Sequence, residues 1–318
     1  MHSKNILIIG SNEKFSIENM YLRAFKSLKY NTKLLHVYNI RKNLINKFFL
    51  KFFRYLYFFY IKKKIFNYIR RNNNFDLVII FKGIYLKKNF INKIKKKNKN
   101  FSFINIFTDN PLNIDYFKDI SNQNILNSIP EFDHLFVYSQ KIKKKLKKIY
   151  KKKIFSYLPF AFDNLLITKK KRNRKVNFDL SFIGTADQNR YETLMKLKDY
   201  KIILAGDGWN KYFLSDNIKY IKNVNFLNYH KIINTSKFSL NLLRKQNKCS
   251  HNMKTFEIPS MGGLLVTEKN IDQSKFFPEN KACLMFKNIK DLKHKLKNCD
   301  FSSKKYKRIK KLGMKFSR

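Results

Sequence analysis

Short apolar runs alternate with longer amphipathic segments along the first half of the chain. Runs of this kind, separated by stretches long enough for a helix, are typical of βαβ units and a parallel sheet. The predicted strands are residues 5–10, 32–40, 76–83, 101–109 and 134–139. The segments expected to be crossover helices are 17–30, 41–72 and 141–150.

A second alternating series follows in the last part of the chain. Its predicted strands are residues 178–184, 201–206, 218–224, 238–243 and 263–268. Between the two series, residues 158–175 contain a proline and then a basic hydrophilic run, which is typical of a linker. A length of 318 residues also favours two domains. We therefore predict an α/β protein with two consecutive Rossmann-like domains.

The predicted domain boundaries follow from this change in residue composition. The N-terminal domain covers residues 1–165, and a basic linker covers 166–176. The second domain covers residues 177–300, and residues 301–318 form a basic C-terminal tail or helix.

Four of the eight glycines stand where a predicted strand stops: Gly10, Gly83, Gly184 and Gly206. Ordinary strand-to-helix turns explain most of them singly. Their shared position favours a ligand site, because open α/β sheets bind ligands at the carboxyl ends of their strands. The stretch "GSNEKF" after the first strand is not G-x-G-x-x-G, which argues against a nicotinamide-dependent dehydrogenase.

The formal charge of +48 would ordinarily indicate a nucleic acid or an anionic membrane as partner. The enriched residues Lys, Asn, Ile, Phe and Tyr all have A/T-rich codons, whereas Gly (8) and Pro (5) are scarce. A low-GC genome therefore explains much of the excess. The charge is spread along both domains without a helix-turn-helix, RNP or zinc-finger pattern, so nucleic acid is not the expected partner.

The three cysteines, Cys249, Cys283 and Cys299, are odd in number and include no C-x-x-C pair. This pattern argues against a disulfide framework and a structural zinc site, and it fits a reducing cytoplasm. No phosphate-binding G-x-x-x-x-G-K-[ST] loop and no H-E-x-x-H motif occurs. We expect no metal and no cofactor, and no apolar run approaches the roughly 18 residues of a membrane span.

The segment 236–268 is the richest in candidate chemistry. A strand leads through a polar basic loop into a short helix that is predicted to begin near Asn252. The N-terminus of a helix attracts phosphate, and Arg244, Lys248 and Lys254 would add positive charge.

Three further residues complete this candidate site. Glu257 could accept hydrogen bonds from a vicinal diol such as a ribose, and Gly262 and Gly263 would let the chain turn from helix to strand. Together the groups describe a pocket for a nucleoside diphosphate. The structural alternative is an amphipathic, C-capped helix with one exposed Glu.

The stretch "HNMKTFEIPSMGGLLVTE" resembles the signature of the CgeB-like (spore maturation protein type) family 1 glycosyltransferases, a branch of the GT-B superfamily. Members read Asn-x-Arg-x-Phe-Glu-Ile, then Gly-Gly and a strand. Ordered matches also cover "FDLSFIGTADQNRYETLMKL", "LAGDGW", "YHKIINTSKFSLNLL" and "FFPENKACLMFKNIKDLKHKL". Looser matches are "DLVIIFKG", "FTDNP" and "YLPFAFD", so the resemblance spans most of 76–297.

The resemblance implies a GT-B fold, with two Rossmann-like domains facing across a cleft. It implies transfer of a sugar, of the hexosyl type, from a nucleotide-sugar to a cell-surface polysaccharide, glycolipid or protein, without a metal. The second domain would hold the donor and the first the acceptor. By position, Glu257 would meet the ribose, Lys254 and Arg244 the diphosphate, and Gly184 the donor side of the cleft, with Asn252, Gly262 and Gly263 in the same site.

Two positions depart from the family pattern. Lys254 replaces the usual Arg, which keeps the charge but loses the bidentate fork. Related GT-B enzymes often carry a second Glu at the position of Cys249. Sugar recognition then differs from that pattern, or the protein is a catalytically inert nucleotide-sugar-binding or cell-surface-assembly protein of the same fold.

An inverting transfer also needs a base near the acceptor. Asp109 in "FTDNP", at a predicted strand end of the first domain, is the candidate, and capping of the turn before Pro111 is the alternative. His36 and His134 lie inside predicted strands and are expected to be core histidines.

The segment 44–71 is rich in Phe and Tyr and places Lys47, Lys51, Arg54 and Lys62 near one face of a predicted helix. A basic aromatic helix of this kind can lie in a membrane interface and meet lipid-linked acceptors. A crossover helix explains the apolar face equally well. The expected location is cytoplasmic, with peripheral contact at the inner face of the membrane as an additional hypothesis.

Overall fold

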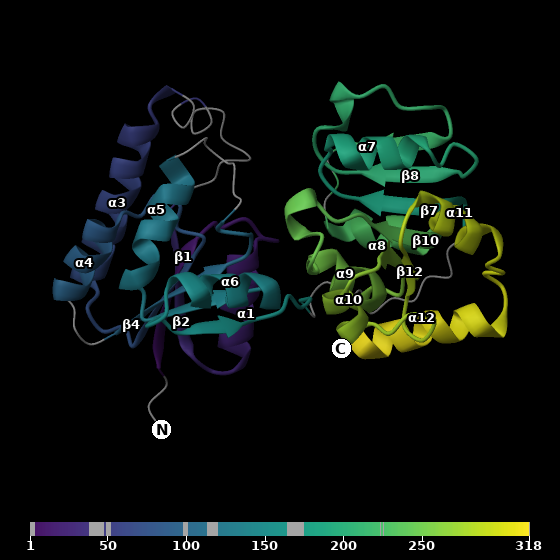
Figure 1. Cartoon of the computed structure of the whole chain (residues 1–318). Helices are drawn as coiled ribbons and strands as arrows, with labels where there is room; N and C mark the ends of the chain where they lie inside the picture. Colours follow the sequence, from purple (N-terminus) through teal and green to yellow (C-terminus); the bar gives the residue numbers. More distant parts are fainter. Residues whose placement is uncertain are drawn as a thin grey trace. The chain divides into compact units, whose positions relative to one another are not determined.

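The computed structural model describes residues 4–37, 48, 52–97, 101–112, 120–163, 175–222, 224 and 226–317. The chain divides into two compact units, Met1–Leu158 and Pro159–Arg318 (Figure 1). Each unit is built on one six-stranded sheet with parallel strand pairs throughout. The prediction of an α/β protein with two Rossmann-like domains is confirmed. The predicted linker 166–176 lies mainly outside the described residues.

The first unit has the strand order β2-β1-β3-β4-β5-β6. Its strands are β1 Asn5–Gly10, β2 Asn31–His36, β3 Leu77–Phe81, β4 Ser102–Phe107, β5 His134–Val137 and β6 Phe155–Tyr157. Its helices are α1 Ile17–Ser27, α3 Arg54–Arg71, α4 Lys88–Lys97, α5 Ile120–Ser128 and α6 Gln140–Ile149, with the short 3₁₀ helix η1 Ile129–Glu131. The order reverses between β1 and β3.

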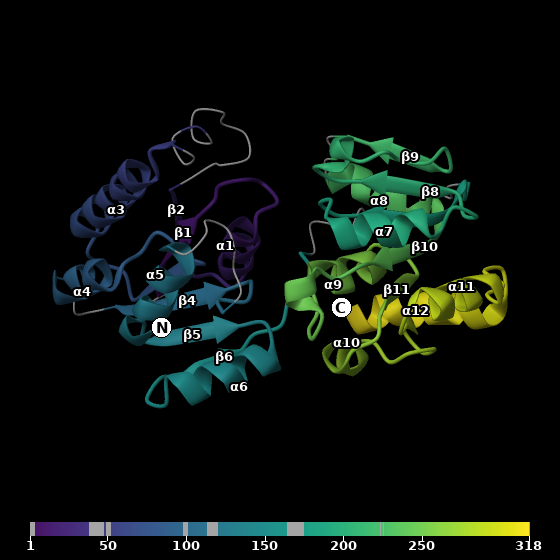
Figure 2. The ribbon, with the colours of Figure 1, turned by 45° about the horizontal axis from the view of Figure 1, so that its top comes forward.

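The second unit has the strand order β12-β11-β10-β7-β8-β9 (Figure 2). Its strands are β7 Phe178–Ile183, β8 Ile202–Ala205, β9 Ile218–Ile221, β10 Ser236–Asn241, β11 Leu265–Glu268 and β12 Leu284–Phe286. Its helices are α7 Gln188–Met195, α8 Phe226–Asn234, α9 Met253–Ser260, α10 Ile271–Phe276, α11 Ile289–Lys297 and α12 Lys304–Ser317, with η3 Trp209–Lys211 and η4 Lys245–Asn247. This is the doubly wound order of dinucleotide-binding sheets, and it reverses between β7 and β10.

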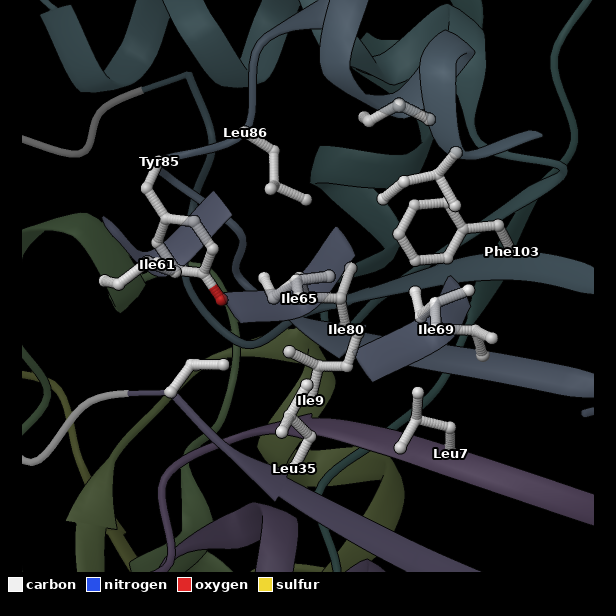
Figure 3. Close-up of a cluster of buried hydrophobic side chains, with 14 of the residues drawn as sticks. Leu7, Ile9, Leu35, Ile61, Ile65, Ile69, Ile80, Tyr85, Leu86 and Phe103 are labelled. Carbon is white, nitrogen blue, oxygen red and sulfur yellow. The ribbon is translucent and has the colours of Figure 1, made fainter. Parts of the chain in front are cut away.

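Helix α3 shows how the apolar pattern builds the first core. Ile61, Ile65 and Ile69 recur every fourth residue, so they share one face of the helix, and each is at most 1% exposed. Figure 3 shows Ile65 and Ile69 near Ile80 of β3, and Ile61 next to Tyr85, all within one cluster of buried side chains. Burial of this face fixes α3 against the sheet.

Several predicted ends need correction. Residues 242–243 were predicted to continue β10, but the strand ends at Asn241, because the carbonyl of Leu242 accepts hydrogen bonds from a side chain and not from a neighbouring strand. Strands β6 and β12 were missed, since three residues are too few to show alternation. Of the predicted helix 41–72, the structure describes α3 from Arg54, and much of 41–51 lies outside the described residues.

Candidate functional site

The candidate site lies at the carboxyl ends of β7 and β10, where the strand order of the second sheet reverses. Such reversals leave a crevice that α/β proteins use for ligands. The turn after β7 is packed tightly: a Cβ on Gly206, whose φ is +132°, would lie 2.2 Å from the carbonyl oxygen of Gly184. Trp209 Nε1 donates a hydrogen bond of 2.8 Å to the same oxygen. The turn is therefore held by close packing of Gly206 on Gly184 and by the side chain of Trp209.

Arg190 bonds to the chain after both β7 and β10 at the reversal point. Its Nε and Nη2 atoms donate to the carbonyl of Leu242 at 3.1 and 2.7 Å, and its Nη1 donates to the carbonyl of Thr185 at 2.8 Å. Asp187 caps α7 by accepting from the backbone N–H of Arg190 at 3.0 Å. Burial lowers the pKa of Arg190 to about 10, with the charge of Asp187 opposing this effect. Arg190 thus ties the loop after β7 to the end of β10.

Positive charge gathers beside Arg190. Arg244 is half-buried and close enough to lower the pKa of Arg190 further, and no described residue pairs with its guanidinium by an ion pair or hydrogen bond. Glu268 Oε2 accepts from the backbone N–H of Leu243 at 3.3 Å. Burial raises the pKa of Glu268, while Lys248 and Arg190 oppose the rise. The half-buried guanidinium of Arg244 is therefore suited to bind an anionic ligand.

Helix α9 begins at Met253, as predicted, and Asn252 caps it. Asn252 Oδ1 accepts from the N–H of Thr255 at 3.1 Å, and Thr255 Oγ1 accepts from the N–H of Asn252 at 3.3 Å. This reciprocal capping box fixes the first turn. The N–H groups of Met253 and Lys254 precede any intrahelical acceptor, so they are available to a ligand at the positive end of the helix.

A buried polar network holds the start of α9 in place. Gln273 Oε1 of α10 accepts from Asn241 Nδ2 at 3.3 Å, from Thr255 Oγ1 at 3.0 Å and from Thr267 Oγ1 at 2.8 Å. All four side chains are at most 2% exposed. Asn241 Oδ1 also accepts from Asn252 Nδ2 at 2.9 Å. The network therefore fastens the α9 cap to β10, β11 and α10.

Lys254 and Glu257 pair with each other. Lys254 Nζ lies 2.5 Å from Glu257 Oε2, and the Glu257 side chain is 5% exposed. The ammonium also lies 4.1 Å from the ring centroid of Tyr229. Burial lowers the pKa of Lys254, but Glu257 and Tyr229 outweigh it, and the pKa is raised overall. Two predicted donor ligands thus stand together as an ion pair.

Gly262 and Gly263 form the turn at the other end of α9. Gly262 has φ +80°, and its N–H donates to the carbonyl of Pro259 at 2.9 Å. The N–H of Gly263 donates to the carbonyl of Ile258 at 2.9 Å, and a Cβ there would lie 2.5 Å from Ile233 Cγ2. The predicted helix-to-strand turn is confirmed. It lies at the C-terminal end of α9, whereas Asn252 lies at the N-terminal end.

His251 anchors the loop before α9. Its side chain is 0% exposed, and its Nε2 accepts from the backbone N–H of Phe160 at 3.1 Å. Burial lowers the pKa of His251 to about 4, so the ring is neutral near pH 7. The neighbouring Ser250 Oγ donates to Asp272 Oδ2 of α10 at 3.0 Å. Cys249, in the same loop, is exposed.

The predicted base Asp109 follows β4 in the first unit. Its carboxylate lies 2.5 Å from Lys82 Nζ and is 15% exposed. Lys82 follows β3 with φ +60°, an uncommon conformation for a residue with a side chain. In the turn that follows β4, Asn110 Oδ1 accepts from the N–H of Leu112 at 3.1 Å. Asp109 is therefore held by an ion pair at the carboxyl edge of its sheet.

Glu18 lies beside the same edge of the first sheet. It is 5% exposed, and its Oε1 accepts from the N–H of Ser11, the residue after Gly10, at 3.2 Å. Burial raises the pKa of Glu18, and its hydrogen bonds and Lys82 oppose the rise.

The two histidines predicted to be core residues are only partly buried. His36 Nδ1 accepts from the N–H of Asn12 at 3.3 Å at the end of β2. His134 begins β5 and stacks on Phe136 with ring centroids 4.3 Å apart. That prediction was wrong because both residues stand at strand ends, where the sheet meets solvent.

Sequence reasoning did not assign Arg190, Glu268, Gln273 or His251 to the site. The signal for Arg190 is the sequence "DQNR", an N-cap followed by a basic residue at the third helical position. Within the described ranges no three His, Cys, Asp or Glu side chains gather in a way that could hold a metal ion. A surface hollow lined by Asn177, Lys201, Asp216 and Lys219 lies at the opposite, amino edge of the sheet.

The two parallel sheets match the GT-B fold that is known from solved glycosyltransferase structures. The sucrose-phosphate synthase of Thermosynechococcus elongatus matches with a TM-score of 0.70 at 9% identity, over 99% of this chain and 94% of that one. Anabaena Alr3699/HepE in complex with UDP and glucose matches with a TM-score of 0.66 at 11% identity, over 99% and 94%. A glycosyltransferase from Rickettsia africae matches with a TM-score of 0.63 at 14% identity, over 100% and 94%.

A family model adds a sequence-level likeness. The model described as glycosyl transferase-like matches residues 188–316, from α7 through α12. The sequence-level similarity to glycosyltransferases therefore lies within the second unit. Among curated proteins, no sequence matches the chain.

Proposed function

We propose that the protein is a glycosyltransferase that moves a sugar, of the hexosyl type, from a nucleotide-sugar donor to an acceptor hydroxyl. The observation that carries the proposal is the half-buried Arg244, which follows β10 at the reversal point of the second sheet, together with the capped start of α9, which is bonded to Asn241 at the end of the same strand. The match of residues 188–316 to the glycosyl transferase-like model supports it, as do neighbours of the same fold that bind UDP and UDP-glucose.

The donor diphosphate would take the positive groups of this edge. Arg244 and the first N–H groups of α9 neutralise the charge that develops on the departing phosphate, which is the main electrostatic need of glycosyl transfer. The turn at Gly184 lets the donor approach the backbone closely. These groups need no metal, so the proposed transfer is metal-independent.

Glu257 and Lys254 would bind different parts of the donor. Their ion pair holds both charges at the same turn of α9. On binding, the ribose hydroxyls donate to the Glu257 carboxylate, and Lys254 adds its charge to the diphosphate. The assignment to the CgeB-like branch rests on these residues and on the ordered matches over 178–297.

The first unit would take the acceptor, with Asp109 as base. The acceptor O–H gives its proton to Asp109 while its oxygen forms the new bond to the anomeric carbon. The bond from that carbon to the diphosphate breaks, and the diphosphate leaves with the electron pair. Lys82 orients the carboxylate through their 2.5 Å pair. The acceptor is a cell-surface polysaccharide, a glycolipid or a protein, reached at the inner face of the membrane by a cytoplasmic enzyme.

A screen of nucleotide-sugars tests the proposal. We expect one donor to raise the melting temperature, and the same donor to release free nucleotide in the presence of protein. Arg244→Ala should abolish both effects, whereas Lys245→Ala, a change at the exposed neighbour, should leave them intact. Asp109→Asn should keep the melting shift and lose transfer.

The alternative function is an inert nucleotide-sugar-binding protein of a cell-surface assembly, which the Cys249 position motivates. A melting shift without nucleotide release or transfer across the panel would support that alternative. If no nucleotide-sugar shifts the melting temperature, the donor site is wrong.

A further inference from the structure

The outer face of α3 carries large apolar side chains that stay exposed. Tyr55, Leu56, Phe59 and Tyr60 are 65%, 62%, 62% and 60% exposed. Leu56, Phe59 and Tyr60 follow Tyr55 by one, four and five residues, so the four side chains lie on one side of the helix. We name this side the aromatic face. The role of α3 as a crossover helix explains the buried side of the helix and leaves the aromatic face unexplained.

Further aromatic residues precede the aromatic face along the chain. Phe48, Phe52 and Phe53 are 52%, 59% and 46% exposed, and the rings of Phe48 and Phe52 lie 4.8 Å apart between centroids. Single exposed apolar residues are ordinary on a protein surface, but a gathering of this kind marks an interaction site.

Basic residues border the aromatic face. Lys63 is exposed on the next turn of α3, and α4 lies beside α3 in both views (Figures 1 and 2). Lys93 and Lys97 of α4 place their ammonium groups 4.9 and 5.5 Å from the ring centroid of Phe66. Helix α3 contains six Lys and Arg residues and α4 contains five, and neither contains Asp or Glu.

We propose that the aromatic face of α3 docks on the anionic lipid surface of a membrane. Tyr and Phe rings and a leucine would enter the boundary between headgroups and acyl chains, while the lysines of α3 and α4 meet anionic headgroups. The helices of the described ranges are not long and apolar enough to cross a bilayer, so the contact is peripheral.

The charge of the molecule decides between this partner and two others. A second copy of the chain would bring two faces bordered by lysines together in a molecule with a formal charge of +48, which opposes self-association. A nucleic acid would satisfy the lysines but would leave Leu56, an aliphatic side chain without a stacking plane, in water. An anionic bilayer satisfies both the apolar and the basic groups.

Flotation with lipid vesicles tests the proposal without any donor, so its outcome is independent of the proposed function. The intact protein should float with phosphatidylcholine vesicles that contain phosphatidylglycerol, and much less with phosphatidylcholine alone. The double variant Phe59→Ser, Tyr60→Ser should bind the anionic vesicles at least roughly tenfold more weakly, since two apolar side chains leave the interface. Phe213→Ser, a change at an 86% exposed residue of the second unit, is the matched control and should bind as the unchanged protein does.

A charge variant completes the test. Lys63→Glu should weaken binding to the anionic vesicles, and added salt should do the same. Because the changed side chains are exposed, thermal melting should be the same for all variants, and a donor that shifts the melting temperature should do so in each.

Four results would overturn the proposal. The first is equal flotation of the serine double variant and the unchanged protein. The second is equal binding to neutral and anionic vesicles. The third is a solution dimer that the double variant dissociates, without vesicle binding, which would assign the aromatic face to a second copy. The fourth is binding of single-stranded DNA, and not of vesicles, that the double variant loses.

Discussion

Lys254 Nζ and Glu257 Oε2 lie 2.5 Å apart, three residues from each other on α9. The Glu257 side chain is 5% exposed and that of Lys254 is 21% exposed, so water screens the pair only in part. A charge in this setting depends on its partner, because an unpaired buried carboxylate is costly. Helix α9, whose N-terminus is part of the candidate donor site, therefore contains a charge pair that also contributes to the stability of the fold.

Replacement of Lys254 should expose this dependence. Lys254→Met should lower the free energy of unfolding by about 2 kcal/mol, because Glu257 loses its counterion. The double variant Lys254→Met, Glu257→Gln should recover part of the loss. Urea unfolding of the two single variants and the double variant gives the coupling energy. A Lys254→Met protein as stable as the unchanged one would show that the pair does not hold in solution.

His251 should make stability depend on pH. Its folded-state pKa is about 4, below the ordinary 6.5, so the unfolded chain binds more protons between these values. The contribution of His251 is complete above pH 6.5 and is lost as pH falls toward about 4, by about 3 kcal/mol in total. Urea unfolding across this range should show a smaller loss for His251→Gln than for the unchanged protein.

The pH dependence of the unchanged protein alone would not isolate His251, because some buried carboxyl groups change the stability with pH in the opposite direction. The comparison with a His251 variant is therefore necessary. Burial raises the pKa of Glu18 and of Asp272, so their contributions are largest at low pH and diminish as pH rises. His294→Gln changes an exposed histidine and is the matched control. An identical pH slope for His251→Gln and His294→Gln would contradict the prediction.

Replacement of the polar side chain of Gln273 by an apolar one should lower the stability of the protein strongly. Gln273→Met removes the acceptor of three buried donors, from Asn241, Thr255 and Thr267, and should lower the free energy of unfolding by about 3 kcal/mol. Denaturant unfolding measures the loss. Gln188→Met on α7 is the control, because among the described residues the Gln188 side chain bonds only the exposed Glu192, at 2.9 Å. Its effect should stay within about 0.5 kcal/mol. Equal effects of the two changes would count against the network.

Gly262 should tolerate asparagine better than alanine. Its φ of +80° lies in the left-handed region, where alanine costs about 1 kcal/mol and asparagine less. Thermal melting of Gly262→Ala and Gly262→Asn should therefore rank alanine below asparagine. The reverse order would mean that the turn after α9 differs in solution.

The fold was largely readable from the sequence because its strands are buried on both faces. Residues 6–9 are a continuous apolar run, and they form the centre of β1. Residues 32–40 were predicted as one strand, yet β2 ends at His36, since an apolar run does not show where ladder pairing stops.

The local parts of the site were readable for a similar reason. Asn252 before an amphipathic run indicates a cap, and the glycine pair indicates the end of the helix. The bonds of Arg190 to the carbonyl of Leu242 join positions 52 residues apart, and a backbone acceptor leaves no trace in residue type. The exposure of Phe59 was also unreadable, because α3 is apolar on more than one side and periodicity does not say which side meets the sheet.

The bond from the N–H of Phe160 to His251 Nε2 determines where the second unit can be separated from the first. A fragment that began at residue 177 would leave the fully buried His251 ring without its donor, since residue 160 supplies it. A fragment that ended at residue 300 would also remove α12, which packs on α9 and carries the buried Ile309. An autonomous second domain for expression or crystallisation therefore runs from Pro159 through α12, and the basic stretch between Phe160 and β7 belongs inside it.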